Sequence, residues 1–194
     1  HLHPLSQARD IIEAEILVNG HPLIVFVNHW KSGASNPKRE PIRVKNAEVL
    51  RNLIDARLRT DPKADIIVAG DLNSHYNHSV LYPDIKTGIN GVLGSSGCES
   101  FIENDLYNLW YELPALKRYA EVWRGHIGTL MHMILSSGLY DNRGISYVDN
   151  SFRQIILPGI NADAIGRPLK WHFAGKTGGC LLYTSDAADE KVRG

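Results

Sequence analysis

Two apolar runs that each stop abruptly at polar residues constrain the fold of this chain more than any other feature. The first is Val25–Val27, followed by Asn28-His29-Trp30-Lys31-Ser32, and the second is Ile66–Ala69, followed by Gly70-Asp71-Leu72-Asn73-Ser74. Short runs of consecutive apolar residues are typical of strands that are buried on both faces of a sheet. The ends of such strands hold side chains rigidly beside open loops. The two strings therefore predict a site at the edge of a buried sheet.

The surrounding sequence predicts an α/β order of elements. Asn19-Gly20 favours a type I′ turn, so we expect Ile11–Val18 and Pro22–Val27 to form a hairpin. Apolar residues at helical spacing predict a helix over Ile42–Thr60, and Asp65–Ala69 is the next expected strand. The remaining expectations are loops over Lys31–Pro41 and Ser74–Ser100, a short helix over Phe101–Leu113, and strands over Tyr119–Trp123, Thr129–Leu135 and Tyr147–Leu157.

Composition and charge argue against several functional classes. The 194 residues suffice for one domain with a sizeable core, and 21 Lys and Arg residues balance 21 Asp and Glu residues. A dedicated binder of long DNA usually carries a basic excess, so the balance weakens that reading but leaves room for a local basic cleft. No apolar stretch approaches the roughly 18–20 residues that span a bilayer. We expect a monomer without a membrane span.

The carboxyl-terminal segment departs from the composition of the residues before it. The run Cys180–Glu190 resembles the in-frame translation of a sequencing adapter. We therefore expect a partial domain over residues 1–179 and a non-native tail over residues 180–194. A genuine solvated tail is the alternative.

The candidate catalytic residues are His29, Asp71 and Asn73. An imidazole near a carboxylate and a carboxamide suits metal-assisted phosphoryl transfer. Residues i and i+2 of an extended segment point to the same side, so we expect Asp71 and Asn73 to face one phosphate. Structural roles are the alternatives: His29 as a strand-end histidine bonded to a loop carbonyl, and Asp71 and Asn73 as turn residues.

Three strings in this order resemble the endonuclease/exonuclease/phosphatase superfamily. They are Asn28–Ser32, Gly70–Ser74 and Thr129-Leu130-Met131-His132-Met133-Ile134-Leu135-Ser136. The resemblance covers His1–Gly179 and is closest to a bacterial, often secreted, nuclease-like branch. It implies an α/β fold class, the DNase I-like four-layer α/β sandwich, which we expect to be incomplete at both ends. It also implies an extracellular or periplasmic location.

The resemblance implies roles for individual residues. His29 would contact the scissile phosphate, Asp71 would orient or deprotonate the attacking water, and Asn73 would hydrogen-bond a phosphate oxygen. Asn28 and Lys31 are expected to bind substrate, although a solvated loop lysine is equally compatible with Lys31. Asp71 and Asn73 are also the expected metal ligands, for Mg²⁺ or Mn²⁺ with Ca²⁺ as a further candidate.

The sequence also departs from the family pattern. The family expects an asparagine and a metal-binding glutamate on strands that would precede His1, and an Asp-His pair where this chain runs Gly178-Gly179-Cys180. It expects an aspartate immediately before His132, where this chain has Met131. The charged groups of a site commonly contribute orders of magnitude in rate, so we expect the chain as written to be inactive.

The expected function of the parent protein is metal-dependent hydrolysis of phosphodiesters, most simply as a nuclease. The substrate would be nucleic acid or another phosphate ester. Two alternatives stay open: a phosphatase acting on a small or lipid phosphate, and a non-catalytic binding descendant of the fold. Met131 is the direct support for the last of these.

Overall fold

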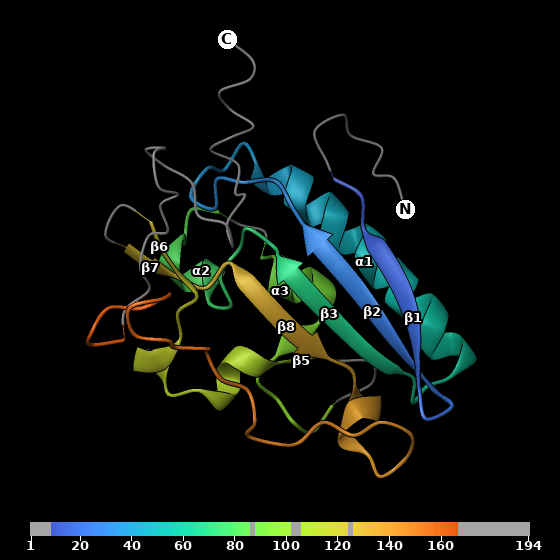
Figure 1. The fold of residues 1–194 in the computed structure, drawn as a ribbon. Helices are drawn as coiled ribbons and strands as arrows, with labels where there is room; N and C mark the ends of the chain where they lie inside the picture. Colours follow the sequence, from blue (N-terminus) through green and yellow to red (C-terminus); the bar gives the residue numbers. More distant parts are fainter. Residues whose placement is uncertain (1–8, 86–87, 102–105, 124–125, 167–194) are drawn as a thin grey trace. The chain divides into compact units, whose positions relative to one another are not determined.

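The computed structural model describes residues 9–85, 88–101, 106–123 and 126–166 (Figure 1). These residues fall into two compact units. The first takes its residues from 1–118 and 129–152, and the second from 119–128 and 153–194. The predicted boundary at residue 179 and the adapter-like tail lie outside the described residues, so both stay predictions.

The first unit is built on a sheet of six strands in the order β1-β2-β3-β8-β5-β4. β1 and β2 are antiparallel, β2 and β3 are parallel, and β8 is antiparallel to both β3 and β5. The strand bounds are β1 Ile12–Val18, β2 His21–His29, β3 Asp65–Asp71, β4 Ser95–Ser96, β5 Leu106–Asn108 and β8 Met131–Leu135. This mixed sheet with helices confirms the α/β fold class.

The helices of the first unit lie in the connections between these strands. The α-helices are α1 Glu40–Thr60, α2 His78–Leu81 and α3 Ile89–Leu93, and the 3₁₀ turns are η1 Leu109–Glu112, η2 Ala115–Lys117 and η3 Ser137–Tyr140. α1 starts two residues before the predicted Ile42, because Pro41 is tolerated in a first helical turn. Its end at Thr60 confirms the sequence prediction.

The hairpin and the long helix follow from local sequence signals. Asn19 and Gly20 adopt φ values of 52° and 84°, as a type I′ turn requires, and they join Val18 to its partner His21. α1 then links the parallel strands β2 and β3 and lies along one face of the sheet (Figure 1). The core on this face is fully buried and includes Leu50, Ile54, Phe26, Ile66 and Val68.

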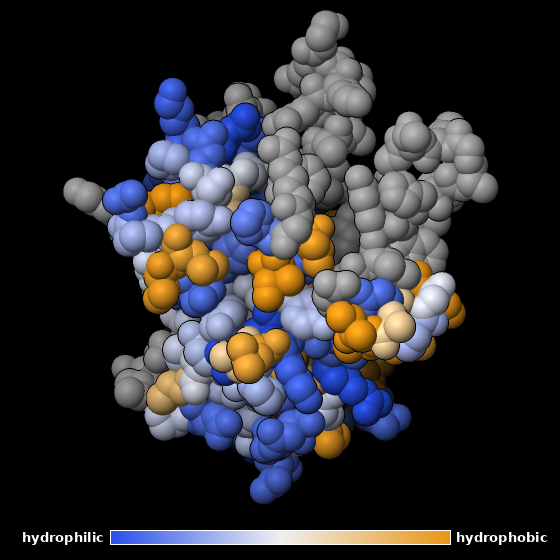
Figure 2. Space-filling view, turned by 90° about the vertical axis from the view of Figure 1, so that its left-hand side faces the viewer, coloured by the Kyte–Doolittle hydropathy of each residue, from blue (hydrophilic) through white to orange (hydrophobic). Residues whose placement is uncertain are grey.

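The opposite face of the sheet carries the side chains that alternate with this core. Near β5 it is covered by a second apolar cluster, which includes Tyr107, Leu135 and Leu139. Towards β1 it leaves Ile12 and Val27 exposed. On the side of the molecule drawn in Figure 2, apolar residues occur in small groups between hydrophilic ones.

Two predicted elements are wrong. Phe101–Leu113 is not a helix, because Tyr107 and Asn108 pair with β8 and the residues after them form only the turn η1. Tyr147–Leu157 is not a strand. Side-chain bonds hold its first part instead: Tyr147 Oη donates to Glu112 at 2.8 Å, and Phe152 N donates to Tyr147 Oη at 2.8 Å. The predicted loop over residues 74–100 contains α2, α3 and β4.

The second unit contains an antiparallel pair, β6 Glu121–Trp123 and β7 His126–Gly128. Tyr119 donates from its hydroxyl to Gly166 O at 2.7 Å, which ties the later segment to the hairpin. The predicted strand Tyr119–Trp123 is thus confirmed in its second half, and Thr129–Leu135 is confirmed in the first unit as β8. Among the described helices, none combines the length and apolar composition that crossing a bilayer needs.

Candidate active site

Two neighbouring strands of the first unit bring the central candidates to one edge of the sheet. His29 is the last residue of β2, Asp71 is the last residue of β3, and the two are register neighbours in the parallel pair. Their side chains meet, with His29 Nε2 3.8 Å from Asp71 Oδ2. The prediction that these residues emerge at the same edge is confirmed. His29 is the more accessible, with 36% of its side chain exposed against 11% for Asp71.

The carboxylate of Asp71 also organises the loop that follows it. Asp71 Oδ1 accepts a hydrogen bond from Asn73 N at 2.8 Å, which is the turn geometry that aspartate favours. The backbone oxygen of Asp71 accepts from Trp30 N at 2.8 Å. One carboxylate oxygen of Asp71 therefore holds the turn, while the other faces His29. Asp71 can thus stabilise the turn and still take part in a reaction at the strand ends.

Asn73 occupies a different conformation from the one expected. Its φ of 49° lies in the left-handed region, so the backbone turns here and the argument from an extended segment is wrong. The carboxamide nitrogen of Asn73 donates to Trp30 O at 3.0 Å, and the side chain is buried. Asn73 thereby joins the loop after β3 to the loop after β2.

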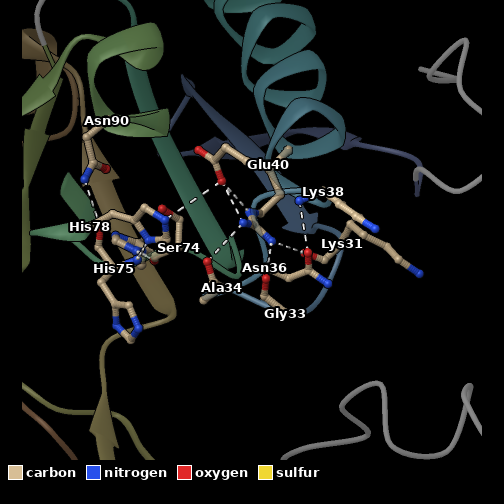
Figure 3. Close-up of polar contacts among 12 residues, drawn as sticks. Lys31, Gly33, Ala34, Asn36, Lys38, Glu40, Ser74, His75, His78 and Asn90 are labelled. Carbon is tan, nitrogen blue, oxygen red and sulfur yellow. Dashed lines mark hydrogen bonds and ion pairs between the residues drawn. The ribbon is translucent and has the colours of Figure 1, made fainter. Parts of the chain in front are cut away.

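Asn28 and Lys31, the two expected substrate contacts, differ in their surroundings. Asn28 is buried and accepts from Trp30 Nε1 at 3.0 Å, while its amide nitrogen donates to Phe26 O at 3.0 Å. Both polar ends of Asn28 are therefore bonded within the protein. Lys31 is partly exposed, and its side chain extends away from the buried contacts beside it (Figure 3). Of the two, Lys31 has the side chain that can reach a ligand.

A family model described as "Endonuclease/Exonuclease/phosphatase family" matches residues 3–179. The chain belongs to this family. No curated protein gives a significant match. Among solved structures, a crystal structure of beta toxin from Staphylococcus aureus is similar, with 14% identity and a TM-score of 0.36. That alignment covers 65% of this chain and 56% of the toxin chain, so this chain spans little more than half of the toxin's length.

Met131 stands where the family pattern expects an aspartate, and the structure places it beside Asp71. Met131 is the first residue of β8 and is paired directly with Asp71 in the antiparallel register. Side chains of directly paired residues lie on the same face, about 4.5–5.5 Å apart at Cβ. His29, Asp71 and Met131 therefore form a row across three strand ends. A carboxylate at position 131 would neighbour that of Asp71.

The metal site that the family implies is not formed by the described residues alone. Among them, no group of three or more His, Cys, Asp or Glu side chains is arranged to hold a metal ion. At the strand ends, the carboxylate of Asp71 is a hard oxygen donor of the kind that Mg²⁺ prefers, and the amide nitrogen of Asn73 is bonded to Trp30. The expected dependence on Mg²⁺ or Mn²⁺ stays a prediction.

Three buried histidines lie behind the site; the sequence placed His132 in a strand there, and sequence reasoning missed His75 and His78. His132 lies in β8, as predicted, and bonds to Ser74 O at 2.7 Å through Nε2 and to Asn108 Nδ2 at 2.9 Å through Nδ1. Because Ser74 O only accepts, Nε2 carries a proton, and because Asn108 Nδ2 donates to Nδ1, Nδ1 carries none and the ring is neutral. His75 and His78 are also buried. Burial lowers the pKa of each of these three histidines to about 4.

Because the pKa values of these histidines are lowered, we expect the free energy of unfolding to fall in mild acid. Between the ordinary pKa of 6.5 and the folded pKa of about 4, the unfolded chain takes up protons that the folded protein does not. Their contribution is therefore complete above pH 6.5 and is lost as the pH falls towards 4. Each histidine loses about 1.4 kcal/mol per pH unit over roughly 1.5 units between pH 6.5 and pH 5, so we expect the free energy of unfolding to drop by up to about 6 kcal/mol from pH 7.5 to pH 5.

Urea unfolding at several pH values measures this effect. His132→Gln keeps a donor for Ser74 O but cannot titrate, so its unfolding free energy should depend less steeply on pH than that of the wild type. His21→Gln is the matched control, because His21 is exposed at the start of β2. Equal pH dependence in the wild type and His132→Gln would show that His132 does not contribute.

Proposed function

We propose that this chain carries the phosphate-handling half of a phosphodiester hydrolase, and that the complete enzyme is a nuclease active with Mg²⁺ or Mn²⁺. The observation that supports the proposal most strongly is the 3.8 Å approach of His29 Nε2 to Asp71 Oδ2 at adjacent strand ends. Membership of the endonuclease/exonuclease/phosphatase family gives the reaction class.

In the proposed reaction, His29 donates a hydrogen bond to a non-bridging phosphate oxygen and stabilises the charge that develops there. Asp71 accepts a hydrogen bond from the attacking water through the oxygen that faces His29, and it takes the proton of that water. Lys31 approaches the phosphate from the loop after β2. Asn73 and Asn28 act chiefly by holding Trp30 and the two strand ends in place. The divalent ion would neutralise phosphate charge, with Asp71 among its ligands.

A non-catalytic binding descendant is the second candidate, and Met131 favours it. The thioether beside Asp71 can neither carry charge nor accept a strong hydrogen bond. A fold that only binds phosphate esters does not need a second carboxylate at this edge. The same argument makes position 131 the place to test the two candidates against each other.

The deciding experiment extends the chain at both ends with the flanking segments of an active family member, with and without Met131→Asp. We expect little or no hydrolysis of DNA or of bis(p-nitrophenyl) phosphate by the unextended chain. The extended protein with Met131→Asp should hydrolyse both in Mg²⁺ or Mn²⁺, and EDTA should abolish the activity. A folded extended protein that binds DNA but cleaves no phosphodiester would favour the binding descendant.

A further inference from the structure

A fully buried arginine lies directly behind the loop that follows His29. Arg43, on the first turn of α1, has no exposed surface. Its Nη1 donates to Lys31 O at 3.1 Å and to Gly33 O at 3.0 Å, and its Nη2 donates to Ala34 O at 3.3 Å (Figure 3). The remaining donors bond to Glu40 Oε2, at 3.0 Å from Nε and 2.6 Å from Nη2. The guanidinium thus uses five hydrogen bonds, which equals its number of N–H groups.

Glu40 also brings this ion pair close to the loop that follows Asp71, without a hydrogen bond to it. It is buried, and its Oε2 lies 3.9 Å from Nε2 of the buried His78. His78 Nδ1 in turn accepts from His75 N at 3.4 Å. Asn90 holds the same loop from the other side, donating to His75 O at 3.0 Å. One ion pair therefore lies between the loop that continues from His29 and the loop that continues from Asp71 (Figure 3).

Stability alone gives little reason for this arrangement. Burying two charges costs desolvation energy that can exceed their attraction, and well-packed apolar residues often replace such a pair without loss. Burial likewise raises the pKa of the Glu40 carboxyl. An apolar pair cannot provide a planar fork that binds three carbonyls of one loop, those of Lys31, Gly33 and Ala34, in fixed directions. The loop at Lys31–Ala34 is rich in small and polar residues, and three of its carbonyls are held by this one guanidinium.

We propose that Arg43 is a positioning residue: it fixes the Lys31–Ala34 loop so that Lys31, two residues after His29, meets a phosphate ester bound at the His29–Asp71 edge. Glu40 orients the guanidinium and sets this loop against the Ser74–His78 loop. The inference deepens the proposed function and rests on it. It makes phosphate binding depend on Arg43 as well, a residue of α1 that does not touch the substrate.

The test compares Arg43→Lys with Arg51→Lys in the full chain. Lysine at position 43 keeps the charge beside Glu40 but loses the fork. Arg51 is the matched control, because it lies on the same helix and also binds a carboxylate and a carbonyl, those of Asp55 and Leu93. Three quantities are measured: urea stability, hydrogen exchange of the Asn36 and Lys38 amides, and binding of inorganic phosphate from NMR shifts at His29 and Lys31.

We expect Arg43→Lys to speed exchange of the Asn36 and Lys38 amides about tenfold beyond any global change, as losing one or two net hydrogen bonds implies. Both amides are bonded within this loop, to Gly33 O and Asn36 Oδ1. Phosphate binding should weaken by about three- to tenfold. Arg51→Lys, which also removes a helix guanidinium bonded to a carboxylate and a carbonyl, should show neither effect. Lys31→Ala should weaken phosphate binding while loop exchange stays as in the wild type.

The outcomes separate this inference from the proposed function. If the wild type shows no phosphate response at His29 or Lys31, the proposed function is wrong, and Arg43 then has no role in it. If phosphate binds and Arg43→Lys leaves both loop exchange and affinity at the level of Arg51→Lys, the positioning role is wrong. Should Arg43→Lys fail to fold, Glu40→Gln decides in its place, because freeing the guanidinium from its ionic partner should loosen the same loop at least threefold.

Discussion

Replacing Gly70 by alanine is expected to destabilise the protein by more than about 3 kcal/mol, at the upper end of single-residue effects. Gly70 has a φ of 122°, and an added Cβ would lie 2.0 Å from Asn28 O and 2.9 Å from Asn28 N. These are backbone atoms of the neighbouring strand, so no side chain can move aside. The variant can fold only if β3 shifts away from β2, which would also separate Asp71 from His29. Urea unfolding followed by tryptophan fluorescence measures the loss.

Gly91→Ala is the matched control for Gly70→Ala. Gly91 lies in α3, has no atom within 4 Å of an added Cβ, and is exposed. Alanine in a helix is favoured over glycine by about 0.5–1 kcal/mol, so this variant should be as stable as the wild type or slightly more stable. A Gly70→Ala variant that unfolds at the same urea concentration as Gly91→Ala would contradict the close approach of β2 and β3.

The sequence predicted the elements that short local signals determine. Asn19-Gly20 specifies its turn because few residues tolerate positive φ, and consecutive apolar residues such as Ile66–Val68 are stable only between two covered faces. A helix between two such strands lets them pair in parallel, as β2 and β3 do. The carboxyl ends of parallel neighbours lie at the same edge of the sheet. The meeting of His29 and Asp71 could therefore be predicted without coordinates.

The parts that the sequence did not predict depend on contacts between distant residues. In the sequence, Arg43 lies between the apolar positions of a helical pattern, which is typical of an exposed charge. Its partners in the loop are backbone carbonyl groups, which every residue has, so no residue type in the sequence indicates that Arg43 is buried. The family resemblance implied that Asn28 contacts substrate, although alternation along β2 places it on the same buried face as Phe26. That alternation was the available signal. The segment after Tyr147 is held by Glu112, which lies 35 residues earlier in the chain.

The largest effect on activity is expected from Asp71→Asn in the extended protein that carries Met131→Asp. Loss of a positioned proton acceptor should lower kcat by a factor on the order of 10²–10⁴. The substitution is well suited to the question, because asparagine keeps an oxygen that can accept from Asn73 N and so preserves the turn. His29→Ala should do comparable damage by removing a charge-stabilising donor, and its partly exposed side chain makes this change mild for the fold.

Asp65→Asn controls for the loss of a carboxylate on the same strand. Asp65 begins β3 at the end opposite Asp71, and its Oδ2 accepts from Ile145 N at 3.0 Å, a bond that an asparagine oxygen can keep. This variant should retain the kcat of its parent, since the strand places position 65 six residues away from the reacting edge. If Asp71→Asn hydrolyses phosphodiesters as fast as Asp65→Asn does, the proton-accepting role of Asp71 is wrong, and its carboxylate serves only the turn to Asn73.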